Sequence, residues 1–248
     1  FGFREVNEIQ AIIEAAGHSD FSRLKESLSR ETPTEGLKNA IQKILSTDAD
    51  TIRSITSSVL SSDMSSTVIN ERETKYFTSL VETYPDDPGL LLFLLMNFVT
   101  LEPGDFLYVS PGVTHAYLRG NVVEITSNSD NVIRCGLTPK HVNAHEFLSI
   151  ASFVSEQPEI QTPAESVHTY ESPTPFTLTR INLNEELEAT LHGPEILIST
   201  QNNFTITNKS ENSFHVEQGH PVWVPYSDTS YKITGNCLLF RCATNPYF

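Results

Sequence analysis

The feature that most constrains the fold is the helical spacing of apolar residues through the first third of the chain. From Arg4 to about Tyr84 few aromatic residues and, early on, Gly17 interrupt it. Residues that can cap helices, Ser19-Asp20 and Thr32-Pro33-Thr34-Glu35, precede two of the apolar sets. The sequence therefore predicts four or five helices, whose inward faces carry Ile9, Ile12, Ile13 and Ala16; Leu37, Ile41, Ile44 and Leu45; and Ile52, Ile55, Val59 and Leu60.

The sequence pattern changes at Leu90, after which short β-like runs are separated by Gly, Pro, Asn and Ser. A helix from Ala144 to Val154 and a linker from Ser155 to Ser166, rich in Pro, Glu and Gln, are the expected exceptions. The predicted fold class is therefore α+β. We expect three parts: a helical domain over 1–85, a β part with a helix over 86–154, and a linker with a second β part over 155–248.

The two β parts share a phrase, LEPGDFLYVSPGVTHAYLRG and VEQGHPVWVPYSDTSYKITG. In each, a Gly, a Pro, a Tyr six residues after the Pro, and a second Gly recur in the same order. Such spacing suits the corners of small antiparallel barrels, although two unrelated hairpins can match it as loosely. The phrase also resembles a conserved motif of cupins, jelly-roll β-barrel proteins. Only the first copy carries His115, which Thr229 replaces in the second, so a metal-ligand role is open to the first copy alone.

Charge and composition exclude several function classes. The net charge of -15 repels phosphate backbones and anionic lipid, so neither nucleic-acid nor membrane partners are expected. The longest apolar run, Leu90 to Val99, contains Asn97 and is too short to span a bilayer. Cys135, Cys237 and Cys242 are odd in number and lack CxxC spacing, which favours a reducing compartment and a cytoplasmic location.

The densest group of chemically versatile residues is HAYLRGNVVEITSNSDNVIRCGLTPKH, residues 115–141, which we call the signature window. Gly120-Asn121 fits a two-residue turn, which predicts a β-hairpin over 115–126 and a third strand over 132–136. Directly opposed residues share a face, so His115, Tyr117 and Glu124 are predicted on one side of the hairpin. A register slip of one residue would undo this arrangement.

The residue types in the window allow two interpretations. His115 could ligate a metal, Glu124 could act as a ligand or base, and Arg134 and Lys140 could stabilise an oxyanion or phosphate. The same side chains could instead form a hydrogen-bonded surface network. Residue types and spacing leave both interpretations open.

The quoted letters of the signature window resemble the signature segment of the type I mannose-6-phosphate isomerases, whose pattern runs HAYL, Gly, Glu, SDN, R-A-G and T-P-K. The resemblance continues upstream through LEPGDFLYVSPGVT and downstream to LLFRCA near the end of the chain. It implies cupin-type antiparallel β-barrels, or jelly rolls, with an all-helical domain. It also implies zinc-dependent interconversion of mannose 6-phosphate and fructose 6-phosphate through a cis-enediol, a cytoplasmic step of carbohydrate metabolism leading toward GDP-mannose.

The resemblance assigns roles position by position. His115 matches the family's zinc-ligating His and Arg134 its catalytic Arg. Glu124 matches a residue of the same cavity, to which we assign acid/base work, and Lys140 is expected in catalysis and substrate binding. Tyr117 is expected to line the substrate cavity. Cys135 stands where the family usually has Ala, and Thr114 where it has Pro.

One departure concerns the metal. The family's other ligands, a Gln and a His close together and a later Glu, have no counterpart before His115, and FGFR at the start resembles the segment just after that Glu. We therefore expect a partial enzyme, the C-terminal part, whose partner is the missing N-terminal segment. Alone, it would bind zinc weakly and be inactive. The alternative is a non-catalytic sugar-phosphate-binding or regulatory cupin that has lost the metal. Another cupin enzyme, such as a dioxygenase, fits poorly because an H-x-H phrase would need His where Tyr117 stands.

Overall fold

A computed structural model describes residues 1–246 except 31, 63–67 and 130. Within these ranges the chain forms two compact units. Unit 1 comprises 1–100, 109–120 and the described part of 130–158; unit 2 comprises 101–108, 121–129 and 159–246. No described helix combines the length and apolar character needed to cross a bilayer. The three sequence ranges given above remain a prediction about domain organisation.

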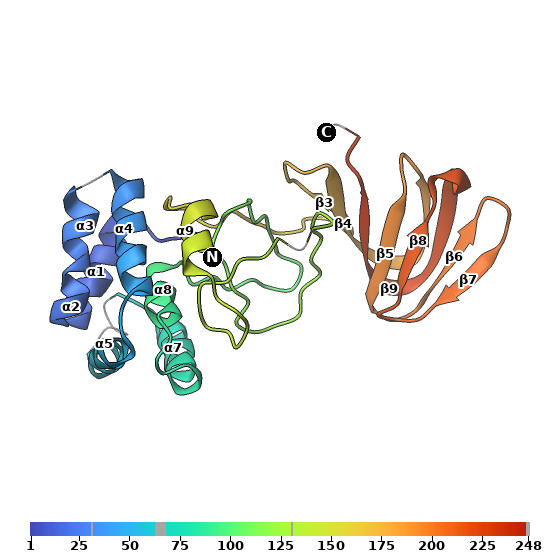
Figure 1. The fold of residues 1–248 in the computed structure, drawn as a ribbon. Helices are drawn as coiled ribbons and strands as arrows, with labels where there is room; N and C mark the ends of the chain where they lie inside the picture. Colours follow the sequence, from blue (N-terminus) through green and yellow to red (C-terminus); the bar gives the residue numbers. More distant parts are fainter. Residues whose placement is uncertain (31, 63–67, 130, 247–248) are drawn as a thin grey trace. The chain divides into compact units, whose positions relative to one another are not determined.

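Unit 1 is built on helices, and the capping residues predict the start of the helix at Pro33 but not that of the helix at Ser19, which His18 caps. Thr32 caps one helix and is followed by Pro33, while Asp48 and Asn70 cap two others through side-chain oxygens that accept from a backbone N–H three residues on. The prediction of helices in this region is confirmed (Figure 1). Their bounds are α1 (Val6–Ala16), α2 (Ser19–Ser22), α3 (Leu24–Arg30), α4 (Pro33–Leu45), α5 (Ala49–Ser61), α7 (Glu71–Thr83), α8 (Gly89–Leu95) and α9 (Ala144–Ile150).

The apolar run that begins at Leu90 is a buried helix, so the prediction that β-like texture starts there was wrong. All seven residues of α8 are buried, and the helix packs against α1, α4, α5 and α7. A segment surrounded on every side shows neither the period of an amphipathic helix nor that of a half-buried strand. The helical core of unit 1 therefore extends to Leu95.

The region predicted as a hairpin forms no strands. Among the described residues, 108–159 contain helix α9 but no β-strand, and Asp130 of the signature window lies outside the described residues. Val122 keeps 63% of its surface exposed and Val132 57%, so neither packs as a strand residue would. Two arms without a third strand to pack on make a marginal hairpin, which accounts for the failed prediction.

Unit 2 contains every strand among the described residues, and each of their pairs is antiparallel. The strands are β1 (Phe106–Leu107), β2 (Ile160–Gln161), β3 (Val167–Tyr170), β4 (Phe176–Thr190), β5 (Glu195–Gln201), β6 (Phe204–Asn208), β7 (Ser213–Val216), β8 (Pro221–Val224) and β9 (Ser230–Thr244). The order β3-β4-β9-β5-β8, with β6 paired to β9 and β7 paired to β6, makes one curled sheet (Figure 1). The α+β class is confirmed.

The curl follows from a change of partner along β9. Its whole length pairs with β4, while on its other side 231–235 pair with β6 and 238–243 with β5. Gly235 stands where the partner changes, and a Cβ there would lie 3.2 Å from the carbonyl oxygen of Asn203. The enclosed side chains, among them Ile181, Leu197, Ile233 and Leu239, are fully buried.

The repeated phrase has matching backbone geometry in its two copies. Gly104 and Gly219 have φ of 97° and 80°, and Gly120 and Gly235 have φ of 130° and 151°. These positive φ values are the conformations that favour glycine. The second copy is a strand, a turn and a strand, as predicted, whereas the first has only the short strand β1.

The predicted linker is partly structured. Ser155 and Glu156 hydrogen-bond with the first residues of unit 1, where Ser155 Oγ donates to the Arg4 carbonyl and the Glu156 N–H donates to the Phe3 carbonyl. Ile160–Gln161 form β2, which pairs with β1. Composition could not predict these contacts, because a segment rich in Pro and Glu can be either a free linker or an extended segment that is hydrogen-bonded.

Candidate functional site

His115 lies in a loop fixed by backbone hydrogen bonds. The Gly2 N–H donates to the Thr114 carbonyl at 2.8 Å, and the Ser152 N–H donates to the Gly112 carbonyl at 2.8 Å. His115 Nδ1 lies 2.9 Å from the Val113 carbonyl oxygen. Because a carbonyl oxygen can only accept, Nδ1 carries the proton, and in the neutral ring Nε2 then has the lone pair. This is the arrangement that orients a histidine for metal ligation.

Tyr117 lies beside His115 in the same unit. Their ring centroids are 5.9 Å apart, with the rings inclined at 73°, an edge-to-face contact. Tyr117 keeps 61% of its surface exposed, so the ring is accessible to a bound molecule. The structure thus brings together the predicted metal ligand and the predicted cavity residue.

Arg134 lies in a segment that is not a strand. Its neighbours Ile133 and Cys135 pack against the helical core of unit 1, while Arg134 is half-buried and its carbonyl accepts from the Asn143 N–H at 3.3 Å. Lys140 is exposed, and its N–H donates to Thr138 Oγ1 at 3.2 Å. Both cations belong to unit 1, as do His115 and Tyr117.

Glu124 is the exception among the predicted site residues. It is exposed and belongs to unit 2, within 121–129. The predicted shared face of His115, Tyr117 and Glu124 required the hairpin, which these residues do not form. The structure therefore places four of the five predicted residues in one unit and the fifth in the other.

Asp87 anchors the signature window and was missed by sequence reasoning. One carboxylate oxygen accepts from the Gly89 N–H at 2.7 Å, at the start of α8, and the other from the Leu137 N–H at 2.9 Å. Gly136 lies against Gly89 so closely that a Cβ on Gly136 would be 2.9 Å from the Gly89 Cα. The phrase Asp-Pro-Gly was a usable signal, because an Asp commonly bonds the backbone two residues on.

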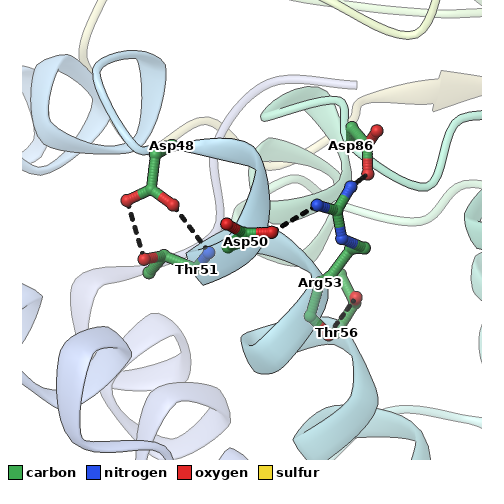
Figure 2. Close-up of polar contacts among 6 residues, drawn as sticks. All are labelled: Asp48, Asp50, Thr51, Arg53, Thr56 and Asp86. Carbon is green, nitrogen blue, oxygen red and sulfur yellow. Dashed lines mark hydrogen bonds and ion pairs between the residues drawn. The ribbon is translucent and has the colours of Figure 1, made fainter.

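The loop that carries Asp87 is also tied to helix α5. Figure 2 shows the Arg53 guanidinium between Asp50, on the same helix, and Asp86. Asp50 and then Asp86 raise the pKa of Arg53 above its ordinary value. Asp48 caps the same helix, accepting from the Thr51 N–H at 2.9 Å. The position of the window thus depends on a chain of contacts from α5 through 86–89 to Leu137.

Cys135, beside Arg134, is predicted to react slowly with alkylating agents. Burial, and secondarily the Asp87 carboxylate, raise the pKa of its thiol to about 11. Because the thiolate is the nucleophile, at pH 8 the thiol should react about 100-fold more slowly than one with the ordinary pKa of 9.0.

Iodoacetamide labelling followed by mass spectrometry would measure this, in a Cys237→Ser/Cys242→Ser background so that one thiol remains. The same protein in urea supplies the reference rate. Equal rates in the folded and unfolded protein would show that Cys135 is neither shielded nor shifted.

The described residues fit one coordination position of a zinc site and not a complete one. The free lone pair and exposure of His115 suit a ligand. Among the described residues, no three or more His, Cys, Asp and Glu side chains are grouped so that they could hold a metal ion. Three or four ligands are needed.

The chain is similar in sequence to two mannose-6-phosphate isomerases. No family model matches the chain. It is 26% identical over 246 residues to the probable mannose-6-phosphate isomerase of Dictyostelium discoideum, covering 93% of this chain and 54% of that protein. It is 44% identical over 72 residues to the mannose-6-phosphate isomerase of Escherichia coli, covering 29% of this chain and 18% of that protein.

The similarity in fold to a solved isomerase extends over nearly the whole of this chain. The Salmonella typhimurium mannose 6-phosphate isomerase, solved with fructose 6-phosphate and zinc, superposes with a TM-score of 0.81 at 23% identity, covering 98% of this chain and 62% of that one. This likeness confirms the predicted cupin fold with a helical domain. Nearly the whole of this chain is matched, but the match spans only about half the length of the Dictyostelium relative.

Proposed function

We propose that this chain, which is related to the mannose-6-phosphate isomerases in both sequence and fold, supplies the C-terminal part of a zinc-dependent aldose-ketose isomerase. The relation to the Dictyostelium protein over 93% of the chain carries the proposal. The substrates would be mannose 6-phosphate and fructose 6-phosphate. The tautomer of His115, which presents Nε2 outward from a fixed loop, supports its assignment as one zinc ligand.

The proposed reaction moves one proton between neighbouring sugar carbons. A base removes the proton from C2 of open-chain mannose 6-phosphate, and the C2–H electron pair forms the C1–C2 double bond. The π pair of the C1 carbonyl moves onto O1, which takes up a proton to give the cis-enediol. Delivery of a proton to C1, with loss of the O2 proton, yields the ketose. We assign the C–H proton transfer to Glu124, because a carboxylate can accept and return it.

The cations have complementary roles in this scheme. Arg134 would stabilise the charge that develops on the sugar oxygens, and its half-buried position beside the helical core would keep the guanidinium in a fixed orientation. Lys140, which lies farther along the chain and is exposed, would bind the phosphate. Tyr117 would line the sugar cavity. Bound zinc would supply Lewis-acid polarisation of the sugar oxygens.

The assembled enzyme requires residues that the described part of the chain does not bring together. We propose that a segment corresponding to the unmatched part of the isomerases supplies the remaining ligands of the zinc site. The acidic chain with three free cysteines fits a cytoplasmic enzyme acting on a small phosphorylated sugar. The chain by itself is proposed to be inactive.

The proposal predicts activity for a chimaera and its loss in one variant. Joining the unmatched part of the Dictyostelium isomerase to this chain should give mannose 6-phosphate isomerase activity. Glu124→Gln in the chimaera should lower kcat by about 100-fold or more, because the amide cannot accept the proton. A coupled assay of fructose 6-phosphate formation, with zinc content measured in parallel, tests both.

The matched control is Glu146→Gln, on helix α9, which should leave kcat unchanged. Near-normal turnover of the Glu124 variant would remove that residue from the base role. A chimaera that binds zinc and mannose 6-phosphate without turning it over would favour a sugar-phosphate-binding protein. Full activity from this chain alone would refute the idea that it is a partial enzyme.

A further inference from the structure

Strand β4 has an open edge along much of its length. On one side it pairs with β9 from Phe176 to Thr190, but on the other β3 covers only Leu178–Ile181. The last contact on that side is the Asn182 N–H donating to the Ser166 carbonyl at 2.6 Å. Within the described part of the chain, no strand covers this side of β4 from Leu183 onward. The sheet therefore ends in an uncovered edge.

The alternation of backbone groups identifies the free donors. Antiparallel strands direct N–H and C=O groups to each side at alternate residues. Because the Asn182 N–H points toward β3, and the register with β9 continues unbroken to Thr190, the groups of Asn184, Glu186 and Glu188 point to the open side. They form the ladder to which another strand can bond.

A groove runs along this edge, with a volume of about 390 Å³, and is lined by residues of 166–167 and 181–187. Its floor has apolar surface from Val167, which is 41% exposed, and from half-buried Leu187. Alternate side chains of an added strand would face this floor. The groove therefore fits a strand that carries apolar residues at every second position.

The charge of the edge selects the kind of strand. Glu185, Glu186 and Glu188 are all exposed, and the nearby ammonium of Lys232 lies 3.7 Å from Glu186. Glu186 and Glu188, at alternate positions of β4, lie on the same face of the sheet, and Glu185 lies on the other. A second copy pairing edge to edge would bring like charges together, which is destabilising in a strand pair. Lysine or arginine on the added strand would complement the carboxylates.

We propose that the open edge of β4 is a docking site for an extended peptide segment in which apolar and basic residues alternate. The backbone groups of Asn184, Glu186 and Glu188 bond the peptide main chain. The groove takes its apolar side chains, and the carboxylates pair with its basic ones. This site is separate from the proposed isomerase chemistry and stands whether or not the chain takes part in catalysis.

The experiment uses the whole chain and a short blocked peptide of alternating valine and lysine. Binding by calorimetry should be accompanied by at least a tenfold slowing of amide exchange at Asn184, Glu186 and Glu188. A peptide with glutamate in place of lysine should bind at least tenfold more weakly. Binding with no exchange protection in β4, or equal binding of the two peptides, would overturn the proposal.

Two variants make the test independent of any one substitution. Glu186→Pro removes an outward N–H from an edge position, which strands tolerate there, and should weaken binding at least tenfold. Glu186→Lys/Glu188→Lys should do the same by reversing charge, whereas Glu217→Lys, between β7 and β8, should not. Unchanged binding in the charge-reversed variant, or association of the free chain through this edge as a dimer, would contradict the assignment.

Discussion

Replacing Glu73 by alanine is expected to lower the free energy of unfolding by about 3–5 kcal/mol, because the change leaves a buried cation without its partner. The Arg4 and Glu73 side chains are 12% and 2% exposed and form an ion pair through Nη2 and Oε1. Arg4 Nε has no hydrogen-bond partner. The buried positive charge of the Arg4 guanidinium is therefore compensated by the Glu73 carboxylate.

Urea unfolding followed by circular dichroism would measure the loss. The control is Arg53→Ala, which removes an exposed guanidinium from its two carboxylates and should change stability little. Replacing both buried partners, Arg4→Met/Glu73→Leu, should restore most of the lost stability. A Glu73→Ala protein as stable as the Arg53→Ala protein would show that the pair is not effectively buried in solution.

Gly136→Ala is expected to cost about 2–4 kcal/mol, since overpacking and a strained backbone each cost on the order of 1–3 kcal/mol. Gly136 has φ of 155°, and a Cβ there would lie 2.5 Å from Asp87 Oδ1 and 2.9 Å from the Gly89 Cα. Neither Asp87 nor Gly89 can move away from the added Cβ easily, because Asp87 is held by the Gly89 N–H and α8 is buried throughout.

The matched control for this change is Gly120→Ala. Gly120 also has a positive φ, 130°, but a Cβ there would meet nothing within 4 Å. The difference between the two variants in urea unfolding therefore isolates the crowding at the crossing with α8. Equal losses in both would mean that backbone conformation alone, and not the contact with Gly89 and Asp87, requires glycine at 136.

Helix positions were predictable because their signals are local. Thr32, Asp48 and Asn70 each lie within three residues of the N–H that they cap, and the apolar spacing of α1, α4 and α5 matches their buried faces, except that Leu60, which was predicted to face inward, is 41% exposed. The run from Leu90 was not predictable in this way. Its structure depends on four other helices that surround it, and a uniformly apolar segment carries no period from which to infer that environment.

The candidate site was predictable in composition but not in geometry. The signature letters identified His115, Tyr117, Glu124, Arg134 and Lys140, but burial does not distinguish Arg134 from Ile133 and Cys135, since all three are half-buried. The predicted shared face did not form, because it depended on a hairpin that requires neighbouring strands. Asp87 escaped notice because its contact with Leu137 joins residues 50 positions apart.

The place of β9 in its sheet determines when unit 2 can fold during synthesis. β9 is the strand against which β4, β5 and β6 all pair, yet it is the last of them to be made. Until Thr244 has left the ribosome, three earlier strands lack their central partner and their apolar faces remain open to chaperones or to aggregation. A helical unit whose contacts are more local can form earlier. Ribosome stalling just before β9 would therefore leave a nascent chain with native-like helices and an unformed sheet.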